Sequence, residues 1–167
     1  SSKETLLSLA KDWMSFFKVP IIAITGSNGK TTTKEMLVKI FKSKYKINYS
    51  KGNYNSLIGL PVNTFEFTTN ADYTIVEMGA SKPGEIDKLC KIIRPDFSVI
   101  TNIHQAHIGN FNSFNDLVKT KTAIYRNTAS DGFIFVNHDD LNILKSSSTF
   151  KNTVSFSFER KKTDFYS

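Results

Sequence analysis

The sequence predicts an α/β domain, a three-layer arrangement in which helices cover both faces of a mostly parallel β-sheet. Segments typical of strands alternate with segments typical of helices along the chain. The strand segments are short, continuous apolar runs, as expected for strands buried on both faces. A glycine-rich loop follows the first of these runs, at the edge where such sheets bind ligands. The 167 residues show no internal repeat or linker, so we expect a single domain.

The first half of the chain is predicted to contain two long helices and three short strands. A helix over residues 1–18 places these apolar residues on one face: Leu6, Leu9, Ala10, Trp13 and Phe17. A second helix, over residues 31–42, is expected to bury Met36, Leu37, Ile40 and Phe41. Strands are predicted at residues 21–25, 45–49 and 73–78. A polar loop at residues 51–56 precedes the segment 57–65, which Gly59 and Pro61 interrupt.

The second half continues the alternation. Pro83 is predicted to open a helix with apolar residues at the spacing of one helical face, namely Ile86, Leu89, Cys90 and Ile93. Ser113 is predicted to cap a helix that carries Phe114, Leu117, Ile124 and Tyr125. Strands are expected at residues 97–101, 133–136 and 154–158, with a short helix at residues 140–145.

The amino-acid composition favours a soluble globular protein over a membrane protein. Hydrophobic residues make up 40% of the chain and charged residues 22%, as in a soluble globular protein. No run approaches the ~18 apolar residues of a membrane span, and nothing resembles a signal peptide, so we expect no membrane partner. Cys90 is the only cysteine, which excludes an internal disulfide and favours the reducing cytoplasm.

The formal charge of +7 raises the question of a nucleic-acid partner. Only three basic residues are arginine, the residue that base edges and phosphates favour. The lysines are scattered rather than clustered. We therefore expect no nucleic acid, and the positive charge also suits anionic small substrates such as nucleotides.

The loop after the first strand is the main candidate binding site. It reads Gly26, Ser27, Asn28, Gly29, Lys30, Thr31 and Thr32. A strand, a glycine-rich loop and a helix in this order present backbone N–H groups to a phosphate. Lys30 is expected to reach the outer phosphates, and the Thr31 hydroxyl can ligate Mg²⁺. The full Walker pattern has a glycine where Ile24 stands, so this is the shorter G-x-x-G-K-T-T form. An ordinary glycine turn is the alternative.

Other polar residues follow strands at the same predicted edge. Glu77 ends a strand and is a candidate Mg²⁺ ligand, with capping as the alternative. His104 and His107 lie in the loop after residues 97–101, and spacing does not choose between them. Zinc is not expected, because no Cys/His pairs have ligand spacing. Lys121 falls within a helix, where a solvated side chain is expected.

The polar loop at residues 51–56 offers further candidates. Asn53, Asn55 and Ser56 are expected either to form the turn or to contact a substrate.

Taken together, these motifs resemble the Mur ligase family. Residues 24–36 are similar to its ATP-binding loop, and the segments 52–61, 76–80 and 106–111 follow in the order the family shows. The resemblance covers nearly the whole chain. It implies an α/β domain of the P-loop-containing, nucleotide-binding type that binds ATP and Mg²⁺.

The resemblance also implies residue roles. Thr31, Glu77 and His107 are the expected metal ligands, so His107 is chosen rather than His104. Lys121 matches a lysine that several members carbamylate, and Lys30, His107 and Lys121 are the expected catalytic residues. Two positions depart from the family pattern: Ser56 stands where asparagine is usual, and Thr122 and Ala123 replace a Gly-Glu pair.

The implied reaction is ATP-dependent amide ligation through an acyl phosphate in peptidoglycan precursor synthesis. The implied small-molecule substrates are UDP-N-acetylmuramoyl-tripeptide and D-Ala-D-Ala, and a monomer is expected. Members of the family have an N-terminal UDP-sugar domain and a C-terminal ligase domain. We expect residues 1–167 to be an excised part of the central ATP-binding domain, inactive alone, that binds Mg²⁺–ATP weakly through its phosphates.

Three alternatives remain open from the sequence. The first is a sister enzyme, another Mur ligase or folylpolyglutamate synthase. The second is a nucleotide-binding module without ligase activity. The third, a phosphate-loop kinase or nucleotidase, is disfavoured because no arginine-rich lid is visible.

Overall fold

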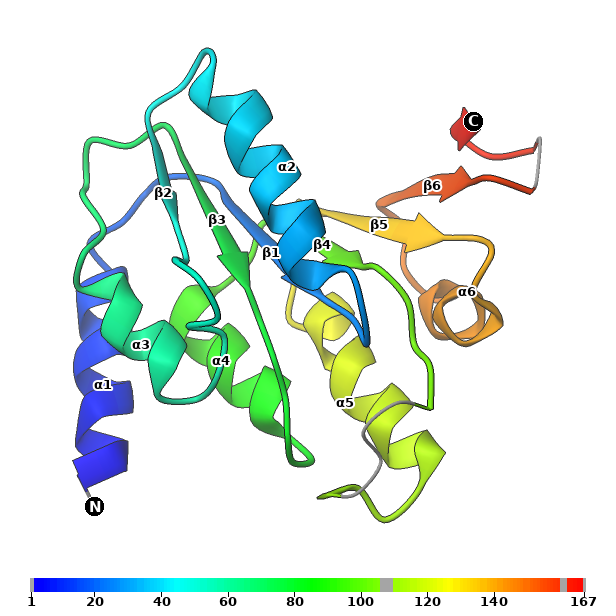
Figure 1. The fold of residues 1–167 in the computed structure, drawn as a ribbon, viewed down its shortest axis with the longest axis horizontal. Coiled ribbons are helices and arrows are strands. Elements are labelled where there is room, and N and C mark those ends of the chain that lie inside the picture. Colours follow the sequence, from blue (N-terminus) through cyan, green and yellow to red (C-terminus); the bar gives the residue numbers. More distant parts are fainter. Residues whose placement is uncertain (1, 106–109, 160–161, 167) are drawn as a thin grey trace.

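The computed structural model describes residues 2–105, 110–159 and 162–166. Its centre is a seven-stranded sheet with the order β2-β3-β1-β4-β5-β6-β7 (Figure 1). Every neighbouring pair of strands is parallel, where the sequence predicts a mostly parallel sheet. The strands are β1 (Ile21–Thr25), β2 (Ile47–Tyr49), β3 (Tyr73–Glu77), β4 (Phe97–Ile100), β5 (Phe133–Asn137), β6 (Thr153–Ser157) and β7 (Phe165–Tyr166). All five residues of β1 are buried, which explains its continuous apolar run.

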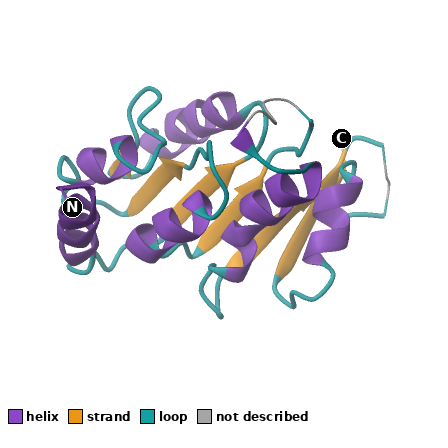
Figure 2. Ribbon diagram, turned by 90° about the horizontal axis from the view of Figure 1, so that it is seen from below, coloured by secondary structure: helices purple, strands orange, loops and turns teal. Residues whose placement is uncertain are grey.

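Helices lie on both sides of this sheet (Figure 2). Their bounds are α1 (Ser2–Met14), α2 (Lys30–Lys42), α3 (Gly59–Thr64), α4 (Glu85–Ile93), α5 (Phe114–Arg126) and α6 (Leu141–Ser147). Helix α2 contacts β1, β2 and β3 on one side. On the other side α4 packs against α5 and α5 against α6, while α1 contacts α3 and α4. The three-layer prediction is therefore confirmed.

Two sequence-based helix bounds are corrected. Helix α1 ends at Met14, before the expected residue 18, and Leu9 is 56% exposed while Met14 is buried. Helix α4 begins at Glu85, because Gly84 takes the left-handed N-cap position that follows Pro83. Ser113 does cap α5, where its hydroxyl accepts a hydrogen bond from the N–H of Asp116 at 3.1 Å.

Helix α2 turns only part of the predicted face to the sheet: Leu37 and Phe41 pack against the core beside Val38, as expected. Met36 and Ile40, expected in the core, are 61% and 64% exposed. The fully buried positions are Lys34 and Val38. The buried face therefore includes Lys34, which the apolar pattern does not indicate, and excludes Met36 and Ile40, which it does.

The sheet has its topological switch point at β1. From β1 the chain passes through α2 to β2 and β3 on one side, and later through α4 to β4 on the other. The loops after β1 and β4 therefore leave the same sheet edge on either side of a crevice, where α/β sheets bind ligands.

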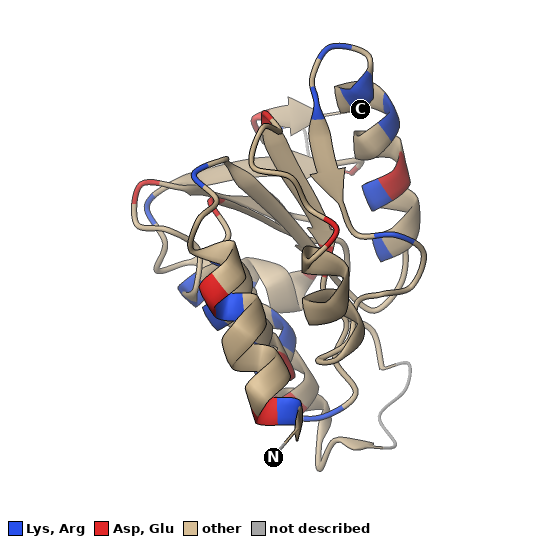
Figure 3. Ribbon diagram, turned by 90° about the vertical axis from the view of Figure 1, so that its left-hand side faces the viewer, with Lys and Arg blue, Asp and Glu red and all other residues tan. Residues whose placement is uncertain are grey.

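The α2 side of the sheet is only partly covered. An apolar groove of about 490 Å³ lies between α2 and the strands β4 to β6, with Phe97, Val99, Phe135 and Phe156 along it. Charged residues are spread over several elements, with acidic residues among the basic ones on the side seen in Figure 3. Within the described residues, no helix combines the length and the apolarity that crossing a bilayer demands.

Candidate functional site

The glycine-rich loop joins β1 directly to the N-terminus of α2. Gly26 and Gly29 have φ of 151° and 76°, conformations that side chains rarely adopt. A Cβ added at Gly26 would also overlap the hydroxyl of Thr101. The loop therefore needs glycine at both positions, and it places the N-terminus of α2 after the carboxyl end of β1. This is the arrangement that binds phosphate.

The loop after β4 braces this phosphate loop. The N–H of Ser27 donates to the carbonyl of Asn102 at 2.8 Å, and the N–H of Asn28 donates to Asn102 Oδ1 at 3.0 Å. Thr101 Oγ1 donates to the carbonyl of Asn28 at 2.6 Å. The hydroxyl of Ser27 also contacts the backbone of His104. Sequence reasoning missed Thr101 and Asn102, since only their position after a strand at the ligand edge could have suggested a role.

Two lysine side chains converge on one carbonyl of the phosphate loop. Lys30 Nζ donates to the carbonyls of Gly26 and Ser27 at 2.9 and 3.0 Å. Lys121 Nζ, from α5, donates to the same Gly26 carbonyl at 2.9 Å. The side chains thus form a compact positive region beside the loop, suited to the negative oxygens of a polyphosphate.

Burial changes the acidity of both lysines. Desolvation lowers the pKa of Lys30, and the nearby Glu77 carboxylate offsets part of that shift. Desolvation, followed by repulsion from Lys30, lowers the pKa of Lys121 from 10.5 to about 8. Lys121 is 5% exposed, so the expectation of a solvated helical lysine is wrong. The structure brings Lys121 to the site, where the resemblance had placed it.

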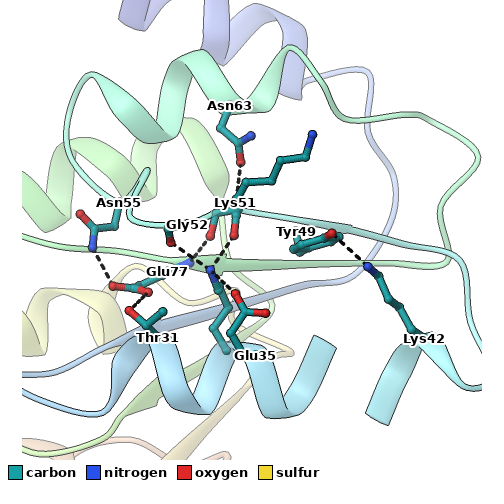
Figure 4. A network of polar contacts seen from close by, with 11 residues as sticks. Thr31, Glu35, Lys42, Tyr49, Lys51, Gly52, Asn55, Asn63 and Glu77 are labelled. Atoms are coloured by element: carbon teal, nitrogen blue, oxygen red, sulfur yellow. Dashed lines mark hydrogen bonds and ion pairs between the residues drawn. The ribbon is translucent and has the colours of Figure 1, made fainter. Parts of the chain in front are cut away.

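Glu77 lies at the end of β3 and is 1% exposed. Its two carboxylate oxygens accept hydrogen bonds from neutral groups, Thr31 Oγ1 at 2.7 Å and Asn55 Nδ2 at 2.6 Å (Figure 4). Among the ion pairs formed by the described residues, none involves Glu77. Burying a carboxylate that makes no direct ion pair is costly, although the Lys30 ammonium lies near enough to interact with it.

These donors fit a magnesium ion. A threonine hydroxyl and a carboxylate converge beside the phosphate loop, and Mg²⁺ prefers such oxygen ligands together with substrate phosphates. A bound cation would also neutralise the buried carboxylate. Groups of three or more acidic, histidine or cysteine side chains do not occur among the described residues, so a protein-only metal cage is not formed there. His107, the third expected ligand, lies outside the described residues.

The structure separates the three candidate substrate residues. Asn55 faces Glu77 directly. Ser56 Oγ accepts a hydrogen bond from the N–H of Gly59, the first residue of α3, at 3.0 Å, and Ser56 also lines the cavity beside the loop. Asn53 is exposed, and its carbonyl accepts a hydrogen bond from the N–H of Asn55 at 2.7 Å. Only Asn55 therefore reaches the candidate metal ligand.

A cavity of about 340 Å³ connects these groups. Ser27 and Lys30 line it from the phosphate loop, Asn55 from the polar loop and Lys121 from α5. Anionic groups brought into this cavity would meet both lysines at once. The geometry can thus place a second reactant next to the outer phosphate of a nucleotide.

The fold and this site define the class of the protein, an α/β domain with a phosphate-binding loop. Residues 24–167 match the family model described as the Mur ligase middle domain. The chain belongs to the Mur ligase middle-domain family.

Individual relatives agree with this assignment. UDP-N-acetylmuramoyl-tripeptide–D-alanyl-D-alanine ligase of Bacillus subtilis is 36% identical over 135 residues, 81% of this chain and 30% of the relative. The crystal structure of MurF from Acinetobacter baumannii aligns with a TM-score of 0.90 and 31% identity over 99% of this chain and 37% of that one. MurF ligase from Thermotoga maritima, solved in complex with ADP, gives a TM-score of 0.89 and 34% identity over 96% and 38% of the two chains. The chain thus spans about a third of the length of these relatives.

Proposed function

We propose that this domain binds ATP with Mg²⁺ and supplies the nucleotide part of the active site of a ligase that joins D-Ala-D-Ala to UDP-N-acetylmuramoyl-tripeptide. The observation that carries the proposal is the convergence of Lys30, Lys121, Thr31 and Glu77 at one sheet edge. The names of the relatives support the choice of substrates. The ADP complex of the Thermotoga maritima structure supports the nucleotide. In this proposal residues 1–167 are part of the central domain of a longer, cytoplasmic ligase.

The proposed reaction has two steps. An oxygen of the tripeptide's terminal carboxylate attacks the γ-phosphorus of ATP, the bond to ADP breaks, and an acyl phosphate forms. The amine of D-Ala-D-Ala then attacks the acyl carbon to give a tetrahedral intermediate. This intermediate releases inorganic phosphate and a proton, and the amide remains.

The residues of the chain serve mainly to position charge. Backbone N–H groups of the loop and the Lys30 ammonium would hold the β- and γ-phosphate oxygens as negative charge shifts between them. Thr31 and Glu77, with His107, would hold Mg²⁺, which neutralises phosphate oxygens when bound. Lys121 would face the same phosphate from α5, next to the cavity in which the carboxylate substrate enters.

Phosphate release tests this function in the complete ligase that contains the domain. With ATP, Mg²⁺ and UDP-N-acetylmuramoyl-tripeptide present, D-Ala-D-Ala is expected to stimulate release strongly, and free glutamate serves as the control amine. Stimulation by another amine but not by D-Ala-D-Ala would assign a sister ligase or folylpolyglutamate synthase instead. Nucleotide binding without release in the presence of any amine would indicate a binding module.

A further inference from the structure

A second lysine on α2, Lys34, is completely buried. Lysine is almost never buried to this degree unless its ammonium is paired. Its three N–H donors match three acceptors: the carbonyls of Ser50 and Gly52 at 2.8 and 3.1 Å, and Glu35 Oε1 at 2.9 Å. The first two acceptors belong to the segment that leaves β2. Lys34 therefore joins the nucleotide-binding helix to a loop some sixteen residues further along the chain.

The loop that Lys34 holds contacts both the backbone and the side chain of Glu77. The hydroxyl of Ser50 accepts a hydrogen bond from the N–H of Glu77 at 2.9 Å. Five residues on, Asn55 Nδ2 donates to Glu77 Oε1, and the N–H of Gly79 donates to the carbonyl of Asn55 at 2.7 Å. Figure 4 shows Gly52, Asn55 and Glu77 in this network. The position of the loop thus determines how Asn55 meets the carboxylate.

Helix α2 contacts the same carboxylate from the other side. Thr31, three residues before Lys34 and on the same helical face, donates to Glu77 Oε2. One face of α2 therefore acts on both oxygens of Glu77. Thr31 binds one oxygen directly, and Lys34 holds the loop that carries Asn55, which binds the other. Because carbonyl acceptors need a donor, an apolar side chain of similar length at position 34 cannot replace these contacts.

We propose that Lys34 is a positioning residue that locks the loop of residues 50–56 to α2 and so sets the geometry of Asn55 and Glu77 for the magnesium-bound nucleotide. The inference rests on the proposed function, since it assigns Glu77 to the metal. Lys34 would thus hold the phosphate loop and the loop of residues 50–56 in a fixed relative position. Its own side chain would touch neither the nucleotide nor the metal ion.

The first test needs no ligand. In NMR spectra of the 167-residue chain, the side-chain amide signals of Asn55 are expected to be displaced from free-amide positions and to exchange slowly. Lys34→Met should move these signals towards free-amide positions. Lys39→Met, the same change at an exposed position of the same helix, should leave them in place. Unchanged Asn55 signals in a folded Lys34→Met chain would overturn the inference.

The second test separates positioning from general stability. Calorimetry at a temperature where both variants are folded would compare ADP affinity with and without Mg²⁺. Lys34→Met is expected to reduce the enhancement of ADP affinity by Mg²⁺ at least tenfold and to change the ADP affinity without metal less than twofold. Lys39→Met is expected to match the wild type in both measurements. Equal enhancement in all three chains would show that Lys34 serves stability alone.

Two further outcomes keep the inference and the proposed function distinguishable. If Lys34→Met does not fold, Lys34→Gln retains an N–H donor in the buried position and should still reduce the Mg²⁺ enhancement at least threefold; no reduction would overturn the inference. If the wild-type chain binds neither form of the nucleotide, the proposed function fails and the role towards the metal fails with it. The Asn55 signals then still decide whether Lys34 positions the loop.

Discussion

At the scale of single residues, Lys121 combines a buried position with a charge. Its ammonium donates to the carbonyl of Gly26 from a side chain that is 5% exposed. Burial lowers its pKa to about 8, so an appreciable neutral fraction exists near that pH. The neutral amine is the nucleophilic form of a lysine side chain.

The lowered pKa of Lys121 makes stability depend on pH. Below pH 8 both the folded and the unfolded chain hold the proton, and the folded state carries the full cost of the buried charge. Between about 8 and 10.5 the folded state releases the proton while the unfolded state keeps it, so the free energy of unfolding rises. The difference of 10.5 minus about 8 corresponds to about 3 kcal/mol.

Urea unfolding of the wild type and of Lys121→Met over this pH range measures the effect. The wild type should gain up to about 3 kcal/mol relative to the variant as the pH rises. Titrating groups distant from Lys121 cancel in the comparison. A constant difference between the two chains would mean that Lys121 keeps an ordinary pKa.

The sequence predicts a site residue only where its type and its position in a motif or after a strand indicate a role. The loop from Gly26 to Thr32 is predicted by its motif between a strand and a helix, and Glu77 by its position at the end of a strand, since the carboxyl ends of parallel strands meet at one edge. Nothing in the sequence distinguishes Lys34 or Lys121 from a solvated lysine, since their burial depends on which helical face meets the rest of the fold. The role of Lys121 came from the resemblance, and Lys34 was missed.

At the scale of elements, α2 buries only part of the helix face that the sequence predicts. Val38 is 5% exposed, whereas Met36 is 61% exposed. Val38→Ala is expected to lower the free energy of unfolding by about 2 kcal/mol, because buried methyl groups are lost and a cavity remains. Met36→Ala should change it by no more than about 0.5 kcal/mol, and thermal or urea unfolding of both variants measures this. A larger decrease in the free energy of unfolding for Met36→Ala would show that Met36 is packed in the core, as the sequence predicts.

Most other elements follow from local signals. The continuous apolar runs of β1 and β3 and the cap at Ser113 identify their elements directly. Strand β7 was not predicted, because its two residues, Phe165 and Tyr166, are both exposed and carry no pattern. It pairs with β6 in parallel through Phe156 and Ser157. Strand β7 therefore forms because β6 offers unpaired backbone groups at the edge of the sheet, and not because of its own sequence.

At the scale of the whole molecule, the groups expected to hold a polyphosphate are backbone N–H groups of the phosphate loop and the ammonium groups of Lys30 and Lys121. Such donors recognise negative oxygens rather than a base. We therefore expect the 167-residue chain to bind ATP and inorganic triphosphate with affinities within about threefold of each other when Mg²⁺ is present. Calorimetry measures both, and Lys30→Ala should abolish the heat in each case. Equal heats for Lys30→Ala and the wild type would remove the phosphate-loop assignment.

The all-parallel sheet has a consequence for the order of folding. Parallel strands cannot close as hairpins, and every pairing requires a crossover. The bond that braces the phosphate loop joins Asn28 to Asn102, 74 residues apart. Contacts so distant in sequence form slowly, after the local helices. The loop therefore reaches its braced conformation only when β4 lies beside β1, and a nucleotide can stabilise only chains in which these two strands have already paired.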